Sequence, residues 1–134
     1  MHLKLPQNNN INIFPIKALK DNYIWLIQEK LNAVIVDPGD AKPILKKLKE
    51  TGLKLLAILI THKHHDHIGG VEELIKNFPD VKIFGPENSE FKFEYKILKE
   101  GDLISILGTT IKFYIIETPG HTLDHIVYVD ANNL

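Results

Sequence analysis

Histidines and one carboxylate are concentrated in a single short segment of this chain. Four of the seven histidines lie beside Asp66 in Thr61-His62-Lys63-His64-His65-Asp66-His67-Ile68-Gly69-Gly70. The spacing HxHxDH lets an extended or turning loop aim imidazole nitrogens and a carboxylate at one small volume, as a metal site requires. Imidazoles packed this closely would repel one another when protonated and would gain little from burial, so metal ligation is favoured over a structural role. The candidate ligands are His62, His64, Asp66 and His67.

A second group of polar residues follows another apolar run, at Thr118-Pro119-Gly120-His121-Thr122-Leu123-Asp124-His125. Pro119 and Gly120 favour a tight turn that would expose His121. Zinc in hydrolytic sites commonly has three protein ligands and keeps the remaining position for water. Spacing alone leaves both His121 and His125 open as the third ligand and favours His121. Asp124 either orients an imidazole, as residues behind metal ligands do, or faces solvent in a turn.

The residues before the first segment predict the elements that hold it. Short apolar and β-branched runs predict strands at 11–18, 23–28 and 32–36. The turn Asp37-Pro38-Gly39-Asp40 ends the third strand, because Pro and Gly favour turns. Asp40 is placed to cap a helix that has Pro43 in its first turn and stops at Gly52.

The histidine-rich segment lies between a predicted strand and a predicted helix. The nearly continuous apolar run at 53–60 predicts a strand that is buried on both faces beneath helices. After the histidines, apolar residues from Val71 to Phe78 follow the helical spacing i, i+3, i+4, i+7, and Pro79 ends that helix. Open α/β sheets place their sites at such strand ends.

The rest of the chain is predicted to be mostly strand. Strands are expected at 81–84, 95–98, 103–107, 111–117 and 126–129, with a turn at Gly85-Pro86 and no assignment for 87–93. The pattern predicts one α/β (α+β) domain over residues 11–134, preceded by a flexible tail at 1–10. Because a core strand at 126–129 rarely has so few residues after it, we expect the fold to be incomplete at its C-terminus.

Composition narrows the class of function. All 16 basic residues are lysine, the net charge is -1, and no basic field indicates nucleic acid binding. The absence of cysteine excludes disulfides and thiolate ligands, so a metal must use His, Asp and water. The first ten residues lack a secretory pattern, and no apolar run of roughly 20 residues could span a bilayer. We therefore expect a cytoplasmic protein without a membrane partner, and make no prediction of its oligomeric state.

Several separate motifs resemble one family. The HxHxDH pattern at 62–67, the following Gly69-Gly70 and Thr118-Pro119-Gly120-His121-Thr122 resemble the metallo-β-lactamase superfamily. Within that superfamily, three segments are similar to glyoxalase II, the hydroxyacylglutathione hydrolases. These segments are Ala18-Leu19-Lys20-Asp21-Asn22-Tyr23-Ile24-Trp25-Leu26, Val36-Asp37-Pro38-Gly39-Asp40 and residues 118–125. Asp124 departs from the common pattern, which has Gly there.

The resemblance implies an αββα sandwich with a two-metal site. In the family, the positions that match His62, His64 and His121 bind one metal, and those that match Asp66 and His67 bind the other. Asp66 and His67 would act in catalysis together with a metal-bound water, and the position matching Asp37 supports the loop from below. A bridging aspartate, one more histidine and most substrate contacts lie further along the family's chain than Leu134.

The implied activity is hydrolysis of S-D-lactoylglutathione to a 2-hydroxy acid and glutathione, a step of methylglyoxal detoxification. Metal-bound hydroxide would attack the thioester, with two zinc ions as cofactor, although imidazole and carboxylate also accept Fe or Mn. One alternative is a truncated, inactive chain that only binds a metal ion. Another is a persulfide dioxygenase-like member of the superfamily, in which Cys usually stands at the position of His125.

Overall fold

The structure is a computed structural model that describes residues 11–18, 22–62, 68–88, 90–118 and 125–133. The predicted tail at 1–10 lies outside these ranges, and the predicted domain at 11–134 stays a prediction. Among the described residues, no helix is long and apolar enough to cross a membrane.

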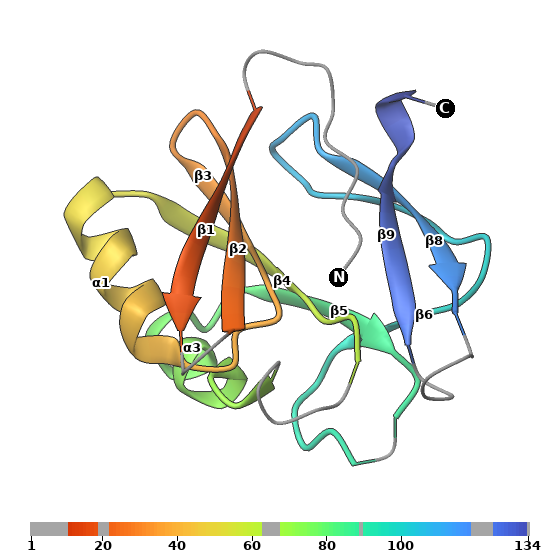
Figure 1. The fold of residues 1–134 in the computed structure, drawn as a ribbon, viewed down its shortest axis with the longest axis horizontal. Helices are drawn as coiled ribbons and strands as arrows, with labels where there is room; N and C mark the ends of the chain where they lie inside the picture. Colours follow the sequence, from red (N-terminus) through yellow and green to blue (C-terminus); the bar gives the residue numbers. More distant parts are fainter. Residues whose placement is uncertain (1–10, 19–21, 63–67, 89, 119–124, 134) are drawn as a thin grey trace.

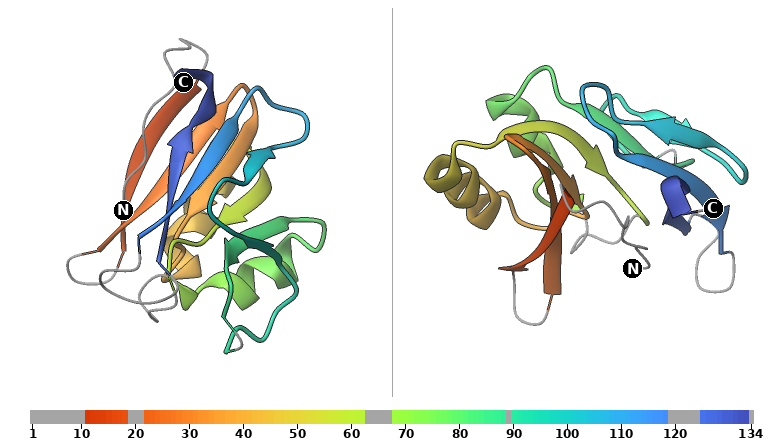
Figure 2. Two further views of the ribbon diagram at one scale, coloured as in Figure 1. Left: turned by 90° about the vertical axis from the view of Figure 1, so that its right-hand side faces the viewer. Right: turned by 90° about the horizontal axis from the view of Figure 1, so that it is seen from above.

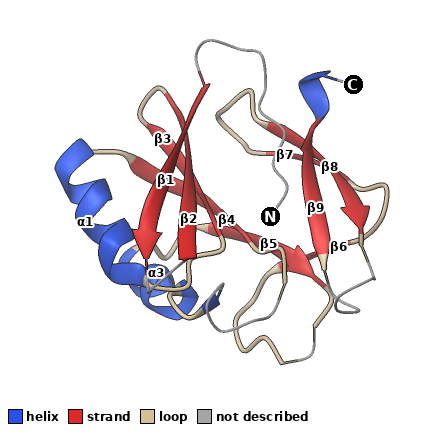
Figure 3. Ribbon diagram, in the orientation of Figure 1, coloured by secondary structure: helices blue, strands red, loops and turns tan. Residues whose placement is uncertain are grey.

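Two β-sheets form the centre of the fold (Figures 1 and 3). The first has six strands in the order β1-β2-β3-β4-β5-β6, and the second has three in the order β7-β8-β9. Strands β1 to β3 pair antiparallel, and β3 to β6 pair parallel. The strands are β1 (Ile11–Ala18), β2 (Asn22–Glu29), β3 (Asn32–Val36), β4 (Lys54–Leu59), β5 (Lys82–Pro86), β6 (Lys96–Leu98), β7 (Leu103–Ser105), β8 (Lys112–Glu117) and β9 (Ile126–Asp130).

The helices begin and end where the sequence signals predict. Helix α1 (Ala41–Thr51) begins after Asp40, whose side chain accepts a hydrogen bond from the Lys42 N–H, and it ends at Gly52 in the left-handed conformation. Helix α3 (Val71–Asn77) follows Gly70, with two acidic residues in its first turn that suit the helix dipole. A short 3-10 helix, η1 (Ala131–Asn133), follows β9.

The two faces of the first sheet pack against different layers. On one face, Ile35 and Ile58 contact the buried side chains of α1 and α3, whereas Val34 and Leu59 point to the second sheet. The view from above in Figure 2 shows this order of helices, first sheet and second sheet. The prediction that the strand at 53–60 is buried on both faces is confirmed, but helices cover only one of them. The described layers fit a metallo-β-lactamase-like sandwich in which no described α-helix covers the second sheet's outer face.

The predicted turn at Gly85-Pro86 is wrong. Both residues belong to β5, where Gly85 pairs with Ile97 and Pro86 pairs with Leu98 of β6. Pairing of β5 with β4 ends earlier, at Phe84 opposite Leu59. Proline has no N–H to donate, so it is tolerated in a strand where its nitrogen does not face a hydrogen-bonding partner strand.

A buried carboxylate joins the two sheets at the end away from the histidines. Glu29 closes β2 and is only 5% exposed. It accepts hydrogen bonds from both the N–H and the hydroxyl of Thr110, in the turn between β7 and β8. The Thr110 carbonyl in turn accepts from the Asn132 side chain after β9. These bonds satisfy a carboxylate that would otherwise be costly to bury.

Gly70 holds the start of α3 against the turn after β3. Its N–H donates to the Pro38 carbonyl at 2.7 Å. A Cβ at this position would lie 2.6 Å from the Ala41 nitrogen and 2.8 Å from the Pro38 oxygen, which are backbone atoms that cannot move aside alone. Glycine is therefore required for this close approach.

We expect Gly70→Ala to lower the free energy of unfolding by about 1–3 kcal/mol, because the added methyl group overpacks a backbone contact. Gly85→Ala is the matched comparison, since its added Cβ would meet side-chain atoms at 3.2 Å or more. We expect the smaller loss from Gly85→Ala. Urea denaturation followed by circular dichroism measures both, and equal losses would contradict the role assigned to Gly70.

Candidate metal centre

Asp37 and Thr61 bind each other at the ends of two neighbouring parallel strands. Asp37 follows β3, and Thr61 follows the apolar run of β4 by two residues. The Thr61 N–H donates to Asp37 Oδ1 at 2.8 Å, and the Thr61 hydroxyl donates to Asp37 Oδ2 at 2.7 Å. Asp37 is 2% exposed and Thr61 is 0% exposed. Both carboxylate oxygens are thus engaged at the base of the histidine-rich segment.

The backbone of Asp37 has a conformation that few side chains adopt. Its φ is 54°, in the left-handed region, where Asp is tolerated better than most non-glycine residues. The Asp37 N–H donates to the Leu59 carbonyl at 2.9 Å, and the Asp37 carbonyl accepts from Gly39 at 2.9 Å. Such a conformation costs on the order of 1–3 kcal/mol and persists where surrounding contacts fix it. The contacts with Thr61 and Leu59 do so here.

His62 is held next to this pair. Its Nδ1 lies 2.8 Å from the Thr61 hydroxyl oxygen, so Asp37, Thr61 and His62 form a continuous hydrogen-bonded chain. The His62 ring also meets the ring of His125 edge to face, with centroids 4.9 Å apart and planes at 68°. Within the part of the chain that the structure describes, the candidate ligands are His62 and the less favoured His125.

The base of the second predicted segment meets the base of the first. The Thr118 N–H donates to the His125 carbonyl at 3.0 Å, which ties together the two ends of the segment between β8 and β9. The Ile126 N–H donates to the Thr61 carbonyl at 2.9 Å. Segments separated by more than fifty residues in the sequence therefore start from adjacent backbone positions, one from each sheet.

The other predicted site residues, His64, Asp66, His67, His121 and Asp124, lie outside the described residues. Among residues that are described, no three His, Asp or Glu side chains form a group that could hold a metal ion. The structure therefore describes the residues at the base of the candidate site, which are Asp37, Thr61, His62 and His125. The other ligand assignments stay predictions.

Tyr128 supports the same strand ends from the second sheet. Its side chain is 1% exposed, and its hydroxyl donates to the Ile60 carbonyl at 2.7 Å. Burial, and secondly the charge of Asp37, raise the pKa of Tyr128 well above its ordinary value, while the hydrogen bond to Ile60 lowers it. The sequence gives no signal for Tyr128, because in an apolar strand pattern it looks like any other core residue. For Thr61 the sequence offers only a weak sign of a role at the site, which is its position directly before His62.

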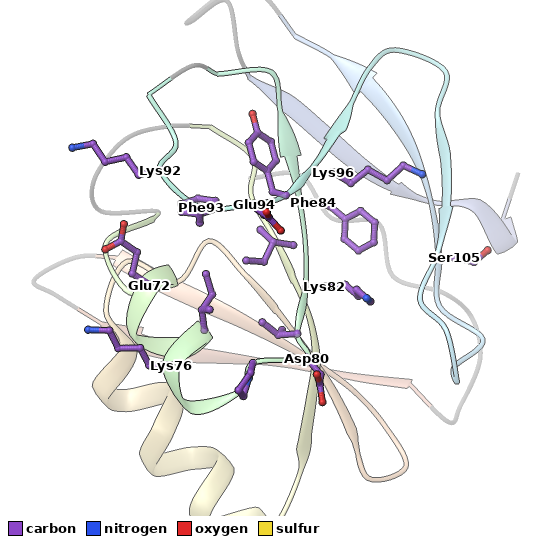
Figure 4. Close-up of a pocket in the computed structure, with 15 residues that line it drawn as sticks. Glu72, Lys76, Asp80, Lys82, Phe84, Lys92, Phe93, Glu94, Lys96 and Ser105 are labelled. Atoms are coloured by element: carbon purple, nitrogen blue, oxygen red, sulfur yellow. The ribbon is translucent and has the colours of Figure 1, made fainter.

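A separate hollow of about 1060 Å³ lies between α3, β5 and residues 92–96 (Figure 4). Phe84, Phe93 and Tyr95 contribute apolar surface, and the lining also includes lysines and carboxylates. In Figure 4 the amino groups of Lys76 and Lys92 point outward. The residues that line the hollow do not include Asp37, Thr61 or His62. The hollow is therefore separate from the candidate metal centre.

Comparison with known proteins identifies the family. The model of the metallo-β-lactamase superfamily matches residues 19–133. This chain belongs to the metallo-β-lactamase superfamily. The hydroxyacylglutathione hydrolase of Buchnera aphidicola subsp. Schizaphis graminum is 46% identical over 114 residues, which cover 84% of this chain and 45% of that protein.

Two solved structures have a similar fold. The crystal structure of the BLEG-1 B3 metallo-β-lactamase has a TM-score of 0.73 at 24% identity, covering 92% of this chain and 68% of that one. The crystal structure of TTHA1623 in a di-iron-bound form has a TM-score of 0.67 at 25% identity, covering 90% of this chain and 68% of that one. This chain spans about half the length of the curated relatives it matches and corresponds to their N-terminal part.

The raised pKa of Tyr128 predicts a loss of stability in alkali. Above about pH 10, the unfolded chain ionises this tyrosine while the folded protein keeps it neutral, so the folded state binds more protons. The contribution of Tyr128 to the free energy of unfolding is fully present below pH 10. Above pH 10 it falls by about 1.4 kcal/mol per pH unit, until the pH reaches the pKa of Tyr128 in the folded protein. Urea denaturation between pH 7 and 11 measures this decline.

Tyr128→Phe is the control, because it keeps the ring and removes the ionisable group. We expect it to be about 1–3 kcal/mol less stable at pH 7, since the Ile60 carbonyl loses its donor. We also expect a shallower decline in alkali. Parallel declines of the two proteins would rule out Tyr128 as the source.

Proposed function

We propose that this chain provides a metal-dependent thioesterase site that acts on 2-hydroxyacylglutathione thioesters such as S-D-lactoylglutathione. The observation that carries the proposal is that one described end of each histidine segment meets the other, through the Ile126 to Thr61 hydrogen bond and the contact of the His62 and His125 rings. Similarity to a hydroxyacylglutathione hydrolase over 84% of the chain supports the choice of substrate class.

The donor set fits a divalent metal. Imidazole and carboxylate ligands suit zinc, iron or manganese, and the chain contains no cysteine to compete. His62, His64 and His121 would hold one ion, and Asp66 and His67 would contribute to the second. His62 carries the feature expected of a metal-binding histidine, a ring nitrogen already hydrogen-bonded to a supporting group. A di-iron form of one structural neighbour is consistent with two ions, and we propose zinc for this chain.

The proposed reaction is addition of water to a thioester. The water oxygen bonds to the carbonyl carbon, the carbon–sulfur bond breaks, and the products are a 2-hydroxy acid and the thiol of glutathione. When bound, the metal would lower the pKa of a water molecule and polarise the carbonyl. Because a thiolate leaves readily, no strong general acid is needed at sulfur.

The residues of this chain have separate parts in that reaction. Asp66 and His67 would act at the reacting centre, and His62 would bind the ion through one ring nitrogen. Asp37 and Thr61 would keep His62 in place without touching the substrate, because both side chains are buried at the base of the segment. Substrate contacts and further ligands would come from the part of the domain that matches the second half of the relatives.

The test is metal content and thioester turnover of the 134-residue chain. We expect purified protein to retain zinc after dialysis and His62→Ala to lose most of it, because one imidazole ligand is removed. We expect turnover of S-D-lactoylglutathione far below that of the Buchnera aphidicola relative, whose chain is about twice as long.

His2→Ala is the matched control, since it removes an imidazole far from both motifs in the sequence. Its zinc content should equal that of the parent protein. Full zinc content in His62→Ala would contradict the ligand assignment. Turnover equal to that of the longer relative would contradict the need for residues beyond this chain.

A further inference from the structure

All three polar groups of Thr61, its N–H, its carbonyl and its hydroxyl, take part in hydrogen bonds at the candidate metal centre. Its N–H donates to Asp37, its carbonyl accepts from Ile126, and its hydroxyl lies within hydrogen-bond distance of both Asp37 and His62. The side chain is fully buried and β-branched, so its χ1 angle has little freedom. The hydroxyl oxygen therefore has a fixed position between a carboxylate and an imidazole.

A hydroxyl group has one hydrogen to donate, and here the carboxylate takes it. The Thr61 hydroxyl donates to Asp37 Oδ2 at 2.7 Å, since a carboxylate oxygen can only accept. The same oxygen lies 2.8 Å from His62 Nδ1 and must accept in that contact. Nδ1 of the neutral ring must then carry the proton, which leaves the lone pair on Nε2.

We propose that the Thr61 hydroxyl is a positioning group that holds neutral His62 in the Nδ1–H tautomer and so makes Nε2 its metal-binding nitrogen. Free histidine in water favours the opposite tautomer, with the proton on Nε2, so the contact has to reverse an intrinsic preference. The tautomer follows from the hydrogen bonds alone, and its use for a metal rests on the proposed function.

Two contacts together fix the orientation of the His62 ring as well as the position of its proton. The bond from Nδ1 to Thr61 sets the direction of one ring edge, and the His125 ring packs against His62 at 68°. Asp37 raises the electron density of the imidazole through the hydroxyl, as carboxylates behind metal-binding histidines do. A valine at position 61 would keep the shape and lose this connection.

The test is the tautomer of His62 in the metal-free 134-residue chain, read from ¹⁵N chemical shifts and long-range ¹H–¹⁵N correlations at a pH where the ring is neutral. We expect Nδ1 to have the shift of a protonated ring nitrogen and Nε2 that of an unprotonated one. Thr61→Ser should keep this pattern, because it keeps the hydroxyl. Thr61→Val should shift His62 toward the Nε2–H tautomer.

Thr118→Val is the matched control, because it removes a partly buried hydroxyl that donates to the His125 carbonyl and does not contact His62. Its His62 pattern should match that of the parent. Zinc affinity is a second measurement. We expect Thr61→Val to bind zinc roughly 10- to 100-fold more weakly than Thr61→Ser.

The wild-type spectrum is decisive even if Thr61→Val fails to fold. A wild-type His62 in the Nε2–H form would overturn the inference, as would an unchanged tautomer in folded Thr61→Val. A wild-type protein with the Nδ1–H tautomer that binds no zinc would support the hydrogen-bond assignment and contradict the proposed function.

Discussion

The paired hydrogen bonds from Thr61 to Asp37 are the constraint on which the candidate centre depends. They join the ends of β3 and β4, hold Asp37 in a left-handed conformation and leave the Thr61 hydroxyl oxygen facing His62. A buried carboxylate must have its oxygens satisfied, so the pair cannot be loosened without a large cost. The candidate centre therefore has a buried base in which Asp37 and Thr61 fix each other.

The two sheets bring the residues on either side of β9's start and β4's end together, so that Ile126 bonds to Thr61 and His125 contacts His62. The Ile126 to Thr61 bond joins the sheets beside the histidines, while Glu29 and Thr110 join them at the other end. Tyr128 reaches from the second sheet to the Ile60 carbonyl between these two links. Because the sheets are joined at both ends, His62 and His125 meet although one follows β4 of the first sheet and the other precedes β9 of the second.

Much of the fold could be predicted from sequence because its signals are local. Asp40 and Gly52 mark the ends of α1, and the strands at 11–18 and 32–36 match the apolar runs. Gly85-Pro86 was mistaken for a turn because pairing with β6 depends on a distant segment. The roles of Thr61 and Tyr128 come from contacts across the sheets, which spacing along one segment cannot reveal, whereas the histidine spacing itself indicated the chemistry.

The most direct test is a crystal structure of the zinc-soaked protein with anomalous diffraction at the zinc edge. We expect an anomalous peak at about 2.0–2.1 Å from His62 Nε2, the usual zinc–imidazole distance, with both oxygens of Asp37 still bound to Thr61. A zinc ion on His62 Nδ1, or one coordinated by the Asp37 carboxylate, would contradict it.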